Sequence, residues 1–145
     1  MRLVLGRLKP KSGCIRVFGE EPNSKYCNIP GPGVGYMPQE IALFNEFTIG
    51  DILSYFGTIY HMESDVIHKR IVHLIDLLRL PKKDRKIGQL SGGQQRLVSI
   101  AVTMIHKPPL LILDEPTVGV DSLLRCQIWQ YLNNICKNEG KYHFN

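Results

Sequence analysis

No apolar run in this 145-residue sequence is long enough to cross a membrane as a helix. Its apolar stretches, such as Leu110–Leu113, fall far short of the roughly 18 residues that a transmembrane helix needs. The opening stretch MRLVLGRLKPKSG has too short an apolar segment for a secretion signal and is interrupted by Arg7. The sequence therefore predicts neither a membrane span nor a signal peptide.

Metal-binding and redox spacings are missing as well. The cysteines form no CxxC pair and the five histidines form no HExxH motif; the cysteines are Cys14, Cys27, Cys126 and Cys136. Structural zinc sites and redox-active thiols usually show such spacings. We therefore expect reduced, structural thiols in a cytosolic domain.

The sequence has no run of like charges that is typical of a nucleic-acid-binding segment. The net charge is +5, and the densest basic run, residues 82–86, holds four Lys or Arg side chains around Asp84. No aromatic residues interleave with it, as a surface that stacks nucleic-acid bases would require. We expect a solvated loop there and no nucleic-acid partner. Hydrophobic residues at 43% and charged residues at 21% indicate one globular domain.

A phosphate-binding loop of the form G-x-x-x-x-G-K-S/T is also absent. Lys11 is the one lysine followed by serine or threonine, and the two glycine positions before it hold Leu5 and Pro10. Proline has no N–H to donate to a phosphate. The glycines of GPGVGY, residues 31–36, have no lysine after them and predict a turn.

The strands that the sequence favours are short. Residues 14–18, CIRVF, alternate in polarity and predict a strand. An extended piece is predicted after the turn at residues 31–36 and ends at Pro38. Leu110–Leu113 is an apolar run bounded by prolines, the pattern of a strand that is buried on both faces.

The helices that the sequence favours fall mostly between the strands. A helix end is predicted over residues 1–8 and a helix from Thr48 or Gly50 to about Tyr60. Further helices are predicted over 65–80 with Ser64 as the cap, from Ser91 to the prolines at 108–109, and over 122–138 with Gly140 as the stop and Ile135 facing inward. The order predicts an α/β core with a helical insertion near residues 40–107.

The stretch LSGGQQR, residues 90–96, opens one of these helices. Ser91 can accept from the first turn, and Gln94 three residues later completes a capping box. Gly92 and Gly93 each cost about 1 kcal/mol relative to alanine inside a helix, which makes sense if some group must approach the backbone closely. The bare N–H groups of a helix N-terminus suit a phosphate. An ordinary capped turn explains the same residues.

The stretch LLILDEP, residues 110–116, places two acids at the end of a predicted strand. Ligands of α/β sheets bind at the carboxyl ends of strands. Asp114 can hold Mg²⁺ there, usually through water, and Glu115 can polarise an attacking water molecule. Two solvated acids at a strand end are the alternative interpretation.

Taken together, the motifs resemble the nucleotide-binding domain of ATP-binding cassette (ABC) transporters. Residues 90–94, LSGGQ, match that family's signature motif, and residues 35–39, GYMPQ, match its Q-loop. Residues 110–114 resemble the Walker B strand, with Glu115 in the catalytic-glutamate position, and residues 118–121, VGVD, resemble the D-loop. The resemblance covers residues 3 to about 140. Residues 38–57 look most like exporters of the eukaryotic G and H subfamilies and the bacterial ABC-2 type.

The resemblance implies a fold of which the sequence covers only the middle. It implies an incomplete P-loop NTPase (RecA-like) core, with core segments of about 1–38 and 108–145 and a helical subdomain of about 39–107. Met1 would fall just after the Walker A loop. The family's last core strand has no counterpart before His143, so no switch role is carried onto that residue. The chain is expected to lack the Walker A segment and the last core strands.

The resemblance also implies roles for site residues, with ATP and Mg²⁺ as cofactors. Glu115 would be catalytic, and Asp114 and Gln39 would hold Mg²⁺ through water. The nucleotide-binding set would be Gln39, Ser91, Gly92, Gly93, Gln94 and Asp121. In this family two cassettes dimerise head to tail, so Ser91, Gly92, Gly93 and Asp121 would act on ATP held by the second cassette.

The implied function is that of a fragment of a transporter's ATPase. Its parent would couple ATP hydrolysis to the export of lipids or hydrophobic compounds, bound to a transmembrane domain on the cytoplasmic face of the membrane. One alternative is a non-transport ABC ATPase of the DNA-repair or translation type. Another is an inactive module that pairs with an intact cassette. Because the phosphate loop is missing, the 145-residue chain alone is expected not to hydrolyse ATP.

Overall fold

The computed structural model of the chain describes residues 2–40 and 42–139, without the side chains of residues 127, 131 and 134–139. Its elements follow the order strand, two helices, a short 3₁₀ turn, helix, strand and helix. They are β1 (Val34–Met37), α1 (Ile49–Ile59), α2 (Ser64–Leu77), η1 (Ile87–Gln89), α3 (Gly92–Met104), β2 (Leu110–Leu113) and α4 (Ser122–Glu139). The predicted α/β class, with a helical middle between the strand before residue 38 and the strand at Leu110–Leu113, is confirmed.

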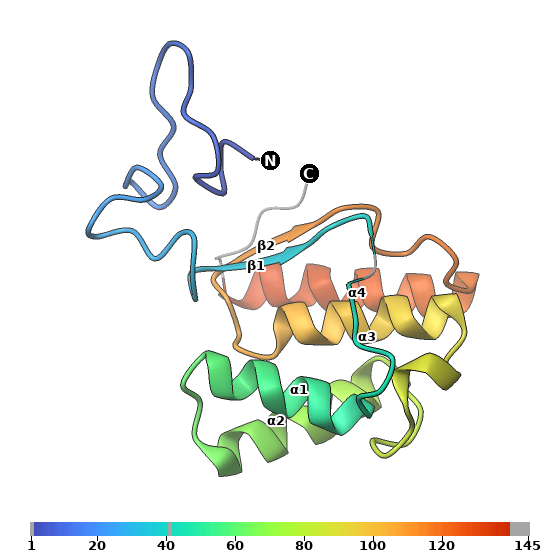
Figure 1. Cartoon of the computed structure of the whole chain (residues 1–145). Helices are drawn as coiled ribbons and strands as arrows, with labels where there is room; N and C mark the ends of the chain where they lie inside the picture. Colours follow the sequence, from blue (N-terminus) through green and yellow to red (C-terminus); the bar gives the residue numbers. More distant parts are fainter. Residues whose placement is uncertain (1, 41, 140–145) are drawn as a thin grey trace.

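The two strands pair in parallel although they lie far apart in the sequence. Val34 pairs with Leu110, and the register runs on to Met37 opposite Leu113. Figure 1 shows the strands side by side, with α3 and α4 against one face and the α1–α2 pair beyond α3. Because the strands are parallel and in register, the segments that follow β1 and β2 leave the sheet at the same end.

Side chains alternate across this small sheet and divide the core in two. Met37 and Leu111 face the helices and join the main core, which includes Ile52, Leu53 and Ile100. Val34 faces the other way and packs with Leu5 and Ile29 from the N-terminal segment. The main core therefore belongs to the helices, and residues 2–33 cover the second face.

The prediction that Leu110–Leu113 is buried on both faces is wrong. Only Leu111 is buried among these four residues, and the other three are half-buried. The face opposite the helices is covered by a few side chains from an irregular segment, not by a second layer of helices. That thin cover leaves Leu110 and Ile112 partly in contact with water.

The N-terminal segment also departs from its prediction. Residues 2–8 form turns and bends instead of a helix end. Residues 14–18 form no strand, and Val17 makes only an isolated bridge to Glu20. An alternating pattern becomes a strand only where a neighbouring strand accepts its hydrogen bonds, and here the chain turns back within three residues instead. The segment is held to the sheet in part by Arg7, whose guanidinium lies 5.6 Å from the centre of the Tyr36 ring.

The helices match their predictions except at some ends. The helix predicted over residues 65–80 is α2, which begins at Ser64 and ends at Leu77. Ser64 is therefore the first helical residue; Glu63 occupies the cap position and makes no side-chain cap hydrogen bond. The helix predicted over 122–138 is α4, but the predicted inward side chain of Ile135 and the stop at Gly140 lie outside the described residues. No helix in the described ranges is long and apolar enough to cross a membrane.

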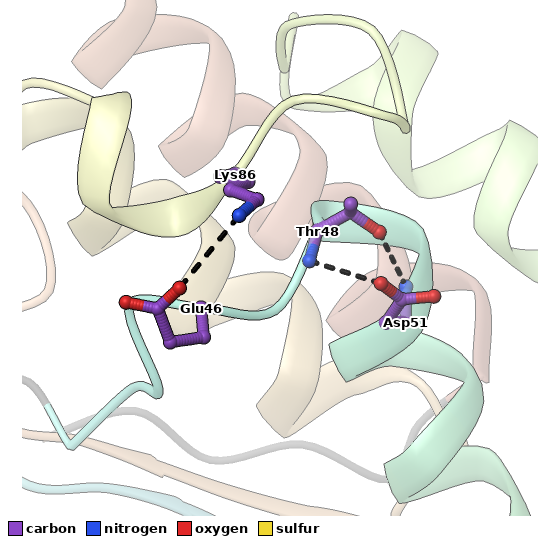
Figure 2. Close-up of polar contacts among 4 residues, drawn as sticks. All are labelled: Glu46, Thr48, Asp51 and Lys86. Atoms are coloured by element: carbon purple, nitrogen blue, oxygen red, sulfur yellow. Dashed lines mark hydrogen bonds and ion pairs between the residues drawn. The ribbon is translucent and has the colours of Figure 1, made fainter.

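A capping box fixes the start of α1. The backbone N–H of Asp51 donates to the Thr48 hydroxyl, and the Thr48 N–H donates to the Asp51 carboxylate, each over 3.1 Å (Figure 2). Lys86 lies 3.7 Å from Glu46 across the same junction, in an exposed ion pair. Backbone hydrogen bonds join the two segments too, from Ile49 to Arg85 and from Ile87 to Phe47. The start of α1 is thereby tied to the basic loop, whose residues 82–86 are exposed as expected.

We expect Thr48→Ala to lower the free energy of unfolding by about 1 kcal/mol, because it removes the side-chain cap of α1. Hydrogen bonds with Thr48 hold the pKa of Asp51 below its ordinary 3.8. The bond with the Thr48 side chain contributes most to this lowering, and the bond with the Thr48 backbone comes second. The stability that this adds is complete above pH 3.8 and is lost as the pH falls through the lowered folded-state pKa. The gap between wild type and Thr48→Ala should therefore narrow below pH 3.8.

The measurement is urea unfolding of both proteins across that pH range. Thr58→Ala is the matched control, since Thr58 lies inside α1 and bonds only to the Ser54 carbonyl of its own helix in the described structure. The control should change the free energy by less than about 0.5 kcal/mol. Equal losses for the two variants would contradict the capping role.

Candidate functional site

Two predicted site residues meet where the paired strands end. The Asp114 N–H donates to the Met37 carbonyl over 3.0 Å, which extends the ladder by one bond. Beyond it, the Gln39 side-chain amide donates to Glu115 Oε2 over 3.2 Å. Glu115 has a φ of 50°, a left-handed conformation that is uncommon for a residue with a side chain. The turn brings the exposed Glu115 carboxylate over the β1 end.

The predicted capping box at the start of α3 is confirmed. The Gln94 N–H donates to Ser91 Oγ over 3.3 Å, and the Ser91 N–H donates to Gln94 Oε1 over 3.0 Å. Both side chains are therefore engaged with the helix start itself. The positive end of the helix dipole and its remaining first-turn N–H groups face outward from this point.

The two glycines of this first turn have different surroundings. A Cβ on Gly93 would lie 2.5 Å from the Gly119 carbonyl oxygen, a distance that real Cβ atoms do not reach. A Cβ on Gly92 would meet no atom within 4 Å. The expected close approach to the backbone is thus made at Gly93 by the chain's own D-loop-like segment. At Gly92 the space is open.

Arg96 is a site residue that the sequence analysis did not single out. Its side chain is 4% exposed. Its Nη1 donates to the carbonyls of Pro38 (3.3 Å) and Gln39, and its Nη2 donates to those of Asp114 (2.5 Å) and Glu115 (2.7 Å). Hydrogen bonds that involve a charged group are each worth about 1.5–3 kcal/mol. They offset the desolvation of a cation that makes no ion pair with any described carboxylate.

A signal for Arg96 is present in the sequence, although a weak one. Arg96, Ile100 and Thr103 follow helical spacing on one face of α3, and the structure buries all three. A cation on a face that is otherwise buried indicates fixed acceptors nearby. The acceptors come from residues 38–39 and 114–115, so no local pattern could identify them.

These groups surround one open hollow of about 400 Å³. Its walls come from the end of β1, the first turn of α3 and the segment after β2; they are Gln39, Gly92, Gly93, Arg96, Glu115, Val118 and Gly119. The structure therefore brings together four of the predicted site residues. Ser91 and Gln94 cap the helix at its edge.

Two predicted site residues stand beside the hollow and not in its wall. Asp114 is half-buried at the end of β2, where both its N–H and its carbonyl are bonded. Asp121 accepts from the N–H groups of Leu123 (3.1 Å) and Leu124 (3.0 Å) and so caps the start of α4. In the described structure Asp121 therefore acts as the cap of α4.

The polar groups around the hollow suit a hard cation, which binds oxygen atoms, and a phosphate, which accepts from N–H groups. They suit a transition metal less well. The described residues contain no cluster of three or more His, Cys, Asp or Glu side chains placed to hold a metal ion. Asp114 and Gln39 offer oxygen atoms at the sheet edge, which fits Mg²⁺ because that ion keeps several of its waters. The helix start at Gly92 offers backbone N–H groups and room for an anion.

Comparison with known proteins gives one consistent result. The family model described as ABC transporter matches residues 1–118. The ABC transporter G family member 23 of Dictyostelium discoideum is 48% identical over 140 residues, which are 97% of this chain and 20% of that protein. The Nod factor export ATP-binding protein I of Sinorhizobium fredii is 39% identical over 135 residues, 92% of this chain and 39% of that protein. The chain thus spans less than half the length of these curated relatives.

Solved structures show the same likeness. The ATP-binding cassette MJ0796, in a dimeric post-hydrolysis state bound to ADP and Pi, superposes with a TM-score of 0.67 at 28% identity, covering 77% of this chain and 50% of that one. A putative ABC transporter ATP-binding protein from Pyrococcus furiosus superposes with a TM-score of 0.79, covering 99% of this chain and 69% of that one. Its identity is 20%, so it supports the fold alone.

The two glycines of α3 allow a sharp test of this geometry. Gly93→Ala should lower the free energy of unfolding by about 1–3 kcal/mol, because the new methyl group forces the Gly119 carbonyl away. Gly92→Ala should not lower it and should raise it by up to about 1 kcal/mol, since the space is open and alanine favours a helix more than glycine does. Urea unfolding of both variants is the measurement. A loss for Gly92→Ala as large as that for Gly93→Ala would show that α3 does not begin as described.

Proposed function

Because this chain belongs to the ABC transporter family, we propose that it forms the central part of a cassette that hydrolyses ATP to drive transport. The observation that supports this most directly is the hollow in which Gln39 and Glu115 face the first turn of α3. Groups that can bind water, a cation or a phosphate line this hollow or stand beside it.

Glu115 is the proposed general base. Its carboxylate is exposed beside the hollow and is bonded to the Gln39 amide, so it can orient a water molecule and accept its proton. Gln39 and Asp114 are the proposed Mg²⁺ ligands through water. Mg²⁺, when bound, would neutralise charge on the phosphate oxygens.

The first turn of α3 is proposed to face a nucleotide held by a second cassette. The open space at Gly92 leaves its backbone accessible to a phosphate, and Ser91, Gly93 and Gln94 shape the same turn. The solved relative MJ0796 is dimeric and bound to ADP and Pi, which supports the same arrangement. Asp121, which caps α4, completes the proposed set that acts across the interface.

Export is the proposed direction of transport. Relatives of the chain bear the names Nod factor export ATP-binding protein and probable multidrug transporter ATP-binding protein. Lipids or hydrophobic compounds are the proposed substrates. The proposed partners are a second cassette and a transmembrane domain, which would hold the chain at the cytoplasmic face of the membrane. The proposed division assigns residues 39–107 to a helical subdomain and residues 1–38 and 108–145 to the core.

An inactive module that pairs with an intact cassette is the second candidate. One observation favours it, because the space at Gly92 is open and leaves the first turn of α3 accessible to a phosphate from outside the chain. The groups around the hollow would then serve a nucleotide bound elsewhere. Two experiments separate the candidates.

The first experiment uses a chimera in which these 145 residues replace the corresponding segment of a complete cassette from a G-family relative, which supplies the phosphate loop and the remaining core strands. Glu115→Gln should leave ATP binding intact and slow hydrolysis ~100- to 10,000-fold, the usual contribution of a general base. Glutamine keeps the shape of the side chain but cannot accept the proton. The measurements are nucleotide binding by calorimetry and phosphate release.

Glu40→Gln is the matched control, since Glu40 is an exposed acid next to Gln39 and does not line the hollow. Its turnover should equal that of the unmodified chimera. If Glu115→Gln hydrolysed ATP within about twofold of that rate, Glu115 would not be the base.

The second experiment uses the 145-residue chain itself. We expect no ATP hydrolysis and very weak Mg-ATP binding, because the phosphate loop supplies much of the positioning and charge stabilisation in phosphoryl transfer. Calorimetric titration and phosphate release measure both, with Glu115→Gln as the control for contaminating ATPases. Micromolar binding together with turnover that this variant abolishes would mean that another part of the chain replaces the loop.

A further inference from the structure

The ladder between β1 and β2 stops just before the proposed site residues. Asp114 donates to the Met37 carbonyl, and the next bond of a parallel ladder would run from the Gln39 N–H to the Asp114 carbonyl; among the described residues no such backbone bond is made. Among the described residues, the carbonyls of residues 38–39 and 114–115 accept no hydrogen bond from a paired strand, and that of Glu115 accepts one backbone bond, from the Val118 N–H over 3.4 Å. Arg96 supplies donors to all four. The sheet is continued beyond its last backbone bond by a side chain from α3.

We propose that Arg96 is a positioning residue that holds Gln39 and Glu115 as a pair. It touches the backbone of both residues and neither of their side chains in the described contacts. The side-chain contact between Gln39 and Glu115 joins residues that are 76 apart in sequence. The guanidinium fixes the two backbones from which that contact is made. The inference rests on the proposed function for its catalytic meaning, but the geometry it claims can be tested without nucleotide.

The side chain must be arginine for this arrangement to exist. A guanidinium is a planar fork whose two terminal nitrogens each carry two N–H groups. One arginine can therefore donate to two carbonyls in each of two segments of the chain. A lysine ammonium has three donors on a single nitrogen and cannot span both pairs. Burial to 4% exposure removes competing water, so the fork's orientation is set by the four acceptors.

Arg96 also connects this pair to the start of α3. It lies four residues after Gly92, and long side chains on a helix run back toward its N-terminus. Gly92, Arg96, Gln39 and Glu115 accordingly line the same hollow. A displacement of the first turn of α3 is therefore transmitted through one side chain to both proposed catalytic segments.

Arg70 provides a comparison within the same chain. Its Nη2 donates over 3.0 Å to the Met104 carbonyl at the end of α3, and its Nε is buried without a hydrogen-bond partner, as is that of Arg96. Arg70 thus anchors α2 to α3 at a distance from the hollow. Losing either guanidinium should destabilise the fold, but only the loss of Arg96 should change the Gln39–Glu115 pair.

The test is nuclear magnetic resonance on the isotope-labelled 145-residue chain. In the wild type we expect nuclear Overhauser contacts between the Gln39 side-chain amide protons and the Glu115 side chain. Arg96→Lys should lose these contacts and keep the methyl resonances of Ile52 and Leu53, which report the main core. Arg70→Lys should keep both. If folded Arg96→Lys retained the Gln39–Glu115 contacts, or if Arg70→Lys lost them equally, the proposal would be overturned.

A measurement on the wild type covers the case in which Arg96→Lys does not fold. Four carbonyl acceptors should slow rotation and solvent exchange of the Arg96 guanidinium, so its Nη protons should give separate, slowly exchanging resonances. A single averaged resonance would overturn the proposal. The proposed function can fail independently, through normal hydrolysis by the Glu115→Gln chimera, whatever the resonances of Arg96 show.

Discussion

The parallel pairing of β1 with β2 is the contact on which the site depends. Each strand has four residues, and their partners lie 76 positions apart. Closing so long a loop has an entropic cost that two short strands alone do not offset. The offset comes from the helices between them, because α1, α2 and α3 bury their apolar faces in the main core that Met37 and Leu111 join. The helical middle of the chain is therefore what brings the two strand ends together.

The same constraint explains why a buried arginine is needed at the end of this sheet. In a wider parallel sheet, neighbouring strands would satisfy the carbonyls that follow Met37 and Leu113. Here the ladder ends at the bond from Asp114 to Met37, and the chain then turns at Glu115 in a left-handed conformation. Arg96 satisfies the carbonyls left over, and in doing so places the two side chains that the sequence had marked as functional. Stability and function thus share one group, so a variant at Arg96 must be assessed for both.

Local patterns predicted most of what is local in this fold. The helix predicted over residues 65–80 is α2, which buries Ile67, Ile71 and Leu74, and the Ser91–Gln94 spacing identified the capped start of α3. Residues 14–18 had an equally clear alternating pattern, yet a strand needs a partner that the sequence does not display. Arg96 was missed for a similar reason, because its acceptors come from two distant segments. Motif residues such as Gln39 and Glu115 could be chosen from sequence, but their 3.2 Å contact follows only from the strand register.

The segment after β2 forms the remaining wall of the hollow, and two contacts lie where it approaches α4. The Gly119 carbonyl lies so close to Gly93 that it leaves no room for a Cβ there, and Asp121 caps α4. Val118, just before these two residues, is 62% exposed, and Leu123, just after them, is 76% exposed. Val118 lines the hollow together with Gly92 and Gly93, and its exposed apolar side chain favours burial against another surface. Under the proposed function that surface is the second cassette, so Val118 would belong both to the wall of the hollow and to the interface with the partner.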